Sequence, residues 1–174
     1  MKKPFLAALF MSCFAFALAA IALFLIYTST AEEVQSLRGQ QQHIHQLIDK
    51  ARLKLAQSPE DKSLVLDLEK LNMERVLLPL PWALEIEMVE NGPISFILNV
   101  FGSAEARKEK LRNLILDQAG KTDLDGCPEE FKRLFRIYAS PTGFGGESLQ
   151  NLRDFAEKYG GSDDFGLPDA TQPE

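Results

Sequence analysis

The chain has 174 residues and carries 19 basic and 25 acidic side chains, a formal net charge of −6. Without Lys2 and Lys3, which precede a long apolar run, 17 basic side chains remain against 25 acidic ones, or −8. This balance excludes the concentrated basic surface that nucleic-acid binding needs, so we expect no nucleic-acid partner. Beyond the apolar run, enough chain remains for one small domain.

The first predicted element is a membrane-spanning helix over residues 5–27. These 23 residues include no charged side chain, and as a helix they reach about 34 Å, enough for a hydrocarbon core about 30 Å thick. A cleaved secretory signal is the alternative, because Ser29-Thr30-Ala31 offers small residues to a signal peptidase. The apolar run is longer than the roughly 7 to 15 residues usual in such signals, which favours an anchor.

The flanking charges predict the orientation of this helix. Lys2 and Lys3 precede it, and Glu32 and Glu33 follow it. Basic flanks tend to stay in the cytoplasm. We therefore expect a single-pass protein of the inner or plasma membrane, with residues 1–4 as a cytoplasmic stub and the rest of the chain extracytoplasmic. The membrane is the first predicted partner.

Small side chains recur along one side of this predicted helix at spacings of three and four residues. Such a stripe lets another membrane helix approach closely, so self-association or binding of another membrane protein is expected. The alternative is that alanine is simply common in membrane helices. The stripe consists of Ala8, Ser12, Ala15, Ala19 and Ala22.

A heptad pattern follows the membrane helix and predicts a helical stalk within residues 31–78. Its seam is polar at Gln41, and a second helix is expected from about Ser58 until Pro79 ends it. The seam fits a parallel coiled coil between two copies. It fits equally an antiparallel αα-hairpin within one chain, because the link between the two helices is short. The seam residues are Val34, Leu37, Ile44, Ile48, Ala51 and Leu55.

Residues 82–159 are predicted to form a small α+β domain, which makes the whole chain α+β and mostly helical. Leu84–Glu90 and Ile94–Phe101 alternate apolar with other residues, so we expect a β-hairpin around Asn91-Gly92-Pro93. Helices are then expected from Ser103 to Gly120 and from Glu147 to Tyr159.

Two further segments complete this part of the chain. Residues 131–139 favour a helix because four apolar side chains recur at helical spacing there, with a third strand as the alternative. Residues 160–174 are rich in Gly, Asp, Pro and Thr, and we expect a disordered tail.

No catalytic, metal-binding or cofactor-binding residues are predicted, and no small-molecule ligand is identifiable. His43 and His45 point about 200° apart on a helix, which does not suit a shared metal. The glycine-rich stretch from Thr142 to Gly146 lacks the Lys-Ser/Thr of a phosphate-binding loop. Cys13 and Cys127 lie on opposite sides of the predicted membrane boundary, so no intrachain disulfide is expected.

These features favour a structural or adaptor protein that presents a helical and α+β domain to other proteins, as a component of a membrane complex. An extracytoplasmic ligand-sensing module that acts through a partner is one alternative, and an anchored enzyme without a recognisable motif is another. The layout is similar to that of the single-pass platform subunits of bacterial secretion and pilus machines. This likeness is one of architecture and involves no motif.

Overall fold

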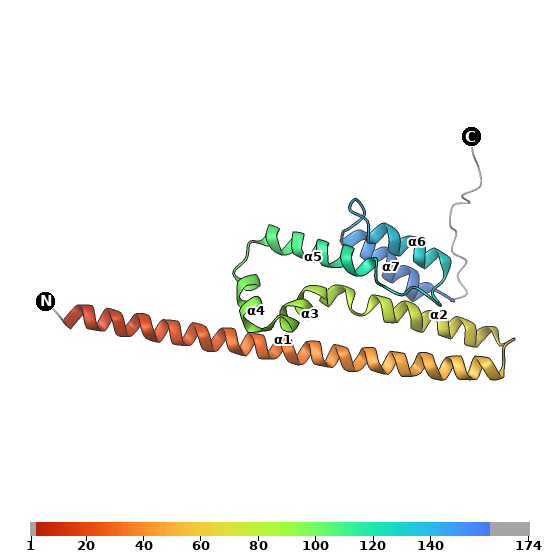
Figure 1. Ribbon diagram of the computed structural model, residues 1–174, viewed down its shortest axis with the longest axis horizontal. Helices are drawn as coiled ribbons and strands as arrows, with labels where there is room; N and C mark the ends of the chain where they lie inside the picture. Colours follow the sequence, from red (N-terminus) through yellow and green to blue (C-terminus); the bar gives the residue numbers. More distant parts are fainter. Residues whose placement is uncertain (1–2, 161–174) are drawn as a thin grey trace. The chain divides into compact units, whose positions relative to one another are not determined.

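The computed structural model describes residues 3–160, with side chains from Phe10 onward. Figure 1 shows helices throughout this part of the chain. The predicted tail lies outside the described residues except for Gly160. The elements are α1 (Lys3–Gln57), α2 (Lys62–Leu77), the short 3₁₀-helix η1 (Leu80–Trp82), α3 (Ala83–Glu90), α4 (Gly92–Val100), α5 (Ala104–Ala119), α6 (Glu129–Tyr138) and α7 (Gly146–Lys158).

The predicted α+β class is wrong, because no strand occurs within residues 3–160. The two segments expected to form a β-hairpin, Leu84–Glu90 and Ile94–Phe101, are the helices α3 and α4 with the residue that follows α4. The likeness to platform subunits with an α+β head is lost with the hairpin. Residues 131–139 lie mostly in α6, so the preference for a helix there is confirmed.

The Asn91-Gly92-Pro93 turn joins two helices instead of two strands. Gly92 has a φ of +81°, a left-handed conformation that glycine adopts without steric cost where a helix ends. Pro93 then lies in the first turn of α4, where its missing N–H is no loss. Alternation of apolar and polar residues over so short a segment does not distinguish a strand from a short helix. The prediction of a β-hairpin from this alternation was therefore wrong.

The chain divides into two compact units, which are described separately. The first contains α1 up to Gln46 together with Leu78–Thr122, and the second contains Leu47–Leu77 together with the described residues from Asp123 on. The single helix α1 enters both. Within α1 there is no proline after Pro4, and Gly39 is its one glycine.

In the first unit α3 is the central element and packs against both α4 and α5. The helix α5 begins as predicted, because the Ser103 hydroxyl accepts a hydrogen bond from the backbone N–H of Ala106. Its Ile115 side chain is buried, as are Ala83 and Met88 of α3 and Phe96 of α4.

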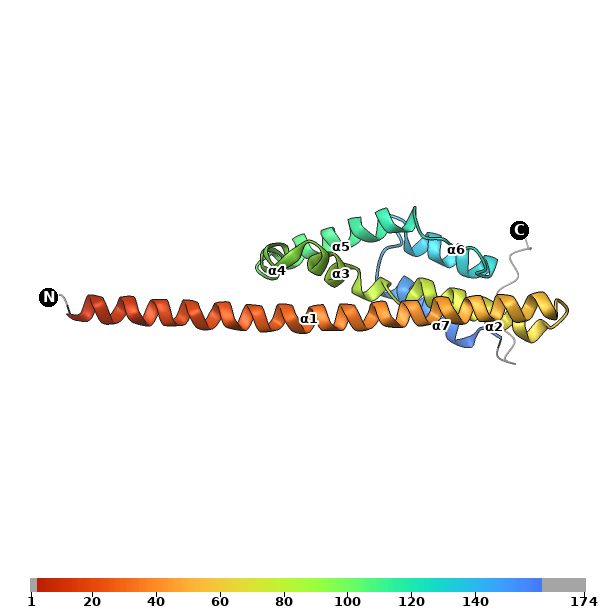
Figure 2. The same cartoon turned by 60° about the horizontal axis from the view of Figure 1, so that its bottom comes forward.

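In the second unit α7 packs against both α6 and α2. The fully buried side chains of this core are Met73, Phe131, Phe135 and Leu152. The Tyr159 hydroxyl, just past α7, donates a hydrogen bond of 2.6 Å to the Glu69 carboxylate of α2. Figures 1 and 2 both show α2 turning back beside the last part of α1, through the link after Gln57.

Candidate functional site

The N-terminal part of α1 is long and apolar enough to cross a membrane. Its large side chains from Phe10 to Ile26 are exposed, apart from Leu23, which is partly exposed, and none of them is buried. A helix that is apolar all round and uncovered is typical of a membrane span. The length and composition of this one helix therefore support membrane anchoring.

The predicted small-residue stripe lies on this exposed part of α1. Ser12, Ala15, Ala19 and Ala22 are all exposed, so no other described part of the chain covers them. Ala8 lies in α1, but its side chain falls outside the described ones. The stripe is thus accessible to another helix, as are the larger apolar side chains beside it.

The predicted coiled-coil seam is covered by the chain itself. Val34, Leu37 and Ile44 are buried in the first unit, and Ile48 and Ala51 in the second, while Leu55 and Gln41 are partly exposed. The 3,4 spacing therefore identified the face of α1 that faces a core. The structure buries this seam within one chain and leaves little of it free for a second copy. Of the buried seam residues only Ile48 and Ala51 lie in the same unit as α2, the partner helix of the antiparallel alternative.

Two contacts hold α3 and α4 against α1, one at the end of the apolar run and one just beyond it. The Tyr27 ring meets the Phe96 ring of α4 edge to face, with centroids 5.4 Å apart. Eleven residues further along α1, the Arg38 guanidinium forms an ion pair with the Glu90 carboxylate at the end of α3. The helices α3 and α4 are therefore held against the part of α1 that would leave the bilayer. Sequence reasoning had placed Tyr27 at the membrane boundary but had missed its partner.

A partly buried lysine joins three helices of the same unit. Lys110 of α5 forms an ion pair of 2.7 Å with Glu87 of α3 and donates a hydrogen bond of 3.2 Å to the Asn99 side chain of α4. Asn99 in turn donates to the Ser95 carbonyl at 2.7 Å. The structure thus gives Lys110 a bridging role inside the unit.

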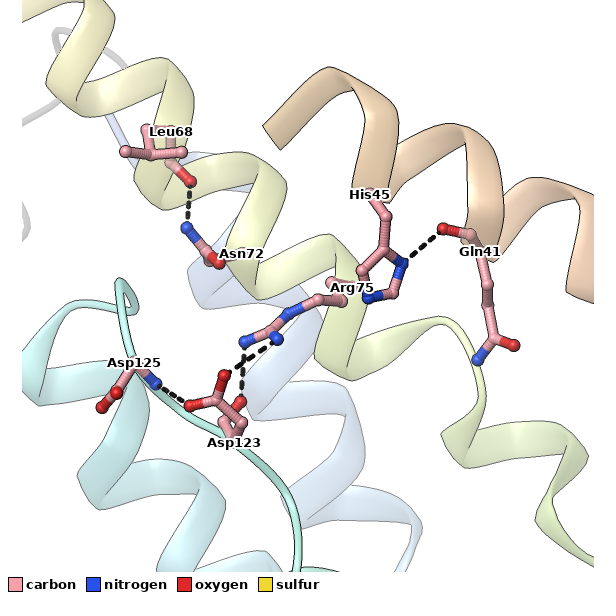
Figure 3. A network of polar contacts seen from close by, with 7 residues as sticks. All are labelled: Gln41, His45, Leu68, Asn72, Arg75, Asp123 and Asp125. Carbon is pink, nitrogen blue, oxygen red and sulfur yellow. Dashed lines mark hydrogen bonds and ion pairs between the residues drawn. The ribbon is translucent and has the colours of Figure 1, made fainter. Parts of the chain in front are cut away.

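A polar cluster in the second unit fixes the loop between α5 and α6, as Figure 3 shows. Arg75 of α2 donates to the Asp123 carboxylate at 3.1 Å and to the Asp123 carbonyl at 2.7 Å. The backbone N–H of Asp125 donates to the same carboxylate at 2.8 Å. These bonds, that of Asp125 first, hold the pKa of Asp123 below its ordinary value.

Gly126 extends this cluster, because its backbone lies close to the Asn72 side chain. A Cβ at Gly126 would lie 2.6 Å from Nδ2 of the buried Asn72, which donates to the Leu68 carbonyl at 2.8 Å. The φ of Gly126 is +77°, again in the left-handed region. The cluster therefore has the character of a structural clamp between α2 and the loop.

The chemically reactive side chains are not gathered in one place. Cys127 is buried, and burial raises the pKa of its thiol to about 11, so it stays protonated and a poor nucleophile at neutral pH. His43 and His45 are exposed on α1, and Nδ1 of His45 lies 2.7 Å from the Gln41 carbonyl. Among the described residues no group of three or more His, Cys, Asp or Glu side chains is placed to hold a metal ion.

Comparison of the chain with known protein families, with curated proteins and with solved structures finds no match.

Proposed function

We propose that this chain is a single-pass membrane-anchored adaptor, which α1 holds in the bilayer while the helical domain binds other proteins of a membrane complex. The observation that carries the proposal is the direct attachment of the first unit to α1 at Tyr27 and Arg38. An anchor fastened in this way, without a flexible linker, keeps a binding surface at a fixed height above the membrane. That arrangement suits assembly of a complex at the membrane.

The domain is proposed to lie outside the cytoplasm in the inner or plasma membrane, because of Lys2 and Lys3 on one side of the run and Glu32 and Glu33 on the other. An alkaline phosphatase fused after Glu174 should be active, and a fluorescent protein that folds only in the cytoplasm should be dark. The opposite pair of results would overturn the orientation.

The adaptor role is tested by what remains bound after mild detergent extraction. We expect the full chain, purified through a C-terminal tag, to bring down a fixed set of membrane proteins in constant ratio. Substitution of Ala15 and Ala19 by isoleucine should reduce the recovery of any partner held through the small-residue stripe. Substitution of Phe14 and Phe16, which are exposed on α1 outside the stripe, by leucine is the matched control. Purification of the chain alone, from cells in which it is made at its native level, would argue against an adaptor.

A further inference from the structure

The helix α4 has an uncovered apolar face. Its buried side chain is Phe96, which is 2% exposed and meets Tyr27. The positions i, i+3, i+4 and i+7 on the opposite side form one face of the helix and its C-cap. They are Ile94, Ile97, Leu98 and Phe101, and all are exposed.

This concentration of exposed apolar side chains is unusual for a surface that meets only water. Beyond the span, the described part of the chain has other exposed large apolar side chains at Val100 of α4 itself and at Leu53, Val65, Leu66 and Ile137, and the last four are scattered over three helices. No charged residue occurs from Asn91 to Ala104. The polar residues of α4, Ser95 and Asn99, bond to each other, and Asn99 also accepts from Lys110.

The contact with Tyr27 fixes the level of α4 relative to the apolar run. Tyr27 is the last residue of that run, and the first charge, Glu32, follows five residues later, about 7.5 Å along the helix. Side chains of a helix lean toward its N-terminus, so the Tyr27 ring leans toward the bilayer. Phe96 touches that ring, and α4 therefore lies at the depth where tyrosine marks a membrane boundary.

The path of the chain from α3 into α4 also places α4 near the bilayer. Glu90, before α4, pairs with Arg38, whereas Phe96 within α4 pairs with Tyr27, which is nearer the span. The chain thus comes nearer to the span between Glu90 and Phe96, before it turns at Phe101–Ser103 into α5. Figure 1 shows α4 beside α1, with α5 leading away from the turn. Arg107 and Lys108, exposed in the first turns of α5, are placed to reach lipid headgroups with long side chains.

We infer that α4 is an interfacial helix, which inserts Ile94, Leu98 and Phe101 among the acyl chains of the same bilayer that α1 crosses. The occupant of the exposed face is lipid, because α4 lies at the level of Tyr27, where the apolar run of α1 ends, and the face carries no charge. The inference rests on the proposed membrane anchoring, and the experiment below separates the two.

A nitroxide attached to single cysteines of the full chain, in vesicles of phosphatidylethanolamine and phosphatidylglycerol, reports the surroundings of each site. Oxygen concentrates in the acyl region, whereas a nickel chelate stays in water. Cys13 of the natural chain reports the span. Leu98→Cys in a Cys13→Ala background reports α4, and Leu53→Cys in the same background is its control, since the two leucines are 69% and 66% exposed. The Cys13→Ala chain without an added cysteine is the background control, because it shows how much label Cys127 takes up.

We expect the label at Cys13 and at position 98 to collide severalfold more with oxygen than with nickel, and the label at position 53 to show the reverse. Nickel accessibility at position 98 equal to that at position 53, with Cys13 in lipid, would overturn the interfacial helix and leave the anchor standing. Protection of position 98 from both reagents would overturn it in favour of a covering protein. Nickel accessibility at Cys13 would remove the anchor and the inference together. Should Leu98→Cys fail to fold, Ile94→Cys probes the same face.

Discussion

Gly126 occupies a position where a side chain fits neither the backbone conformation nor the available space. Its φ is +77°, and a Cβ would come within 2.6 Å of Asn72, a side chain that is buried and already bonded to Leu68. The glycine thus lets the loop lie directly on α2. This close approach is absent from any sequence pattern, because it joins residues that are 54 positions apart.

We predict that Gly126→Ala lowers the free energy of unfolding by about 1–2 kcal/mol, because alanine is strained at positive φ and displaces Asn72. Gly39→Ala is the control, since nothing lies within 4 Å of a Cβ at Gly39. Because Gly39 lies in an exposed helix, that change should stabilise by up to about 1 kcal/mol. Thermal unfolding followed by circular dichroism in detergent compares the two. Equal stability of Gly126→Ala and the natural chain would contradict the clamp.

Cys127 gives a second prediction for single residues. With a thiol pKa of about 11, it should react with a small maleimide far more slowly at pH 8 than an unfolded chain does, in a Cys13→Ala background. The rate should rise as the pH is raised from 8 toward 11, because the thiolate fraction increases. The raised pKa also means that the unfolded state loses the thiol proton first, so stability should fall above about pH 9. Rapid labelling of the native chain at pH 8 would show that the thiol is accessible.

Among the helices, those of the first unit are joined by polar contacts as well as by a core. Lys110 reaches α3 through Glu87 and α4 through Asn99. Both ends of the ion pair are less than a third exposed, so it is better shielded than a surface pair. The position of α4 against α1 therefore depends in part on a residue of α5.

We predict that Lys110→Met lowers the free energy of unfolding by about 1–2 kcal/mol, because Glu87 is then partly buried without its cation. Lys108→Met on the exposed side of α5 should change it by less than about 0.5 kcal/mol. The double change Glu87→Gln with Lys110→Met should recover part of the loss, and the coupling measured in thermal unfolding separates the pair from packing effects. Additive losses would show that the ion pair contributes nothing.

Local signals sufficed for most of the helices but not for the fold class. Ser103 and Gly120 bound α5 as their capping roles predict, and the spacing of Phe131 and Phe135 correctly predicted a helix. The hairpin is wrong because the alternation of apolar residues with glutamates in α3 does not identify a strand; Glu87 and Glu90 instead pair with Lys110 and Arg38. Apart from Ile86 and Val89, every residue of α3 is a strong helix former, and that preference was the overlooked signal. The partners of Tyr27 and Gly126 come from tertiary contacts that no local pattern contains.

For the molecule as a whole, the open question is whether copies associate through the seam or through the span. Ile44 is 5% exposed and Ile48 is 3% exposed, so both are already packed within one chain. The span carries an accessible small-residue stripe instead. We therefore expect self-association within the bilayer and not along the stalk.

We predict that Ile44→Cys and Ile48→Cys, each in a Cys13→Ala background, give no disulfide-linked dimer when membranes are treated with a copper oxidant. Ala15→Cys in the same background should cross-link if copies meet through the stripe. Non-reducing gels of membranes containing the full chain provide the measurement. Rapid cross-linking at position 44 or 48 would support the parallel coiled coil and contradict the packing of this seam within one chain.

The contact between Tyr27 and Phe96 also bears on how this protein can be studied. A shortened version that starts at Glu32, the usual way to make an anchored domain soluble, would strip the tyrosine ring from Phe96. The helix α4 would then present apolar side chains on two opposite sides, with neither lipid nor Tyr27 to meet them. Such a fragment should aggregate through these side chains. The aggregation would reflect the missing anchor and not a poorly folded domain.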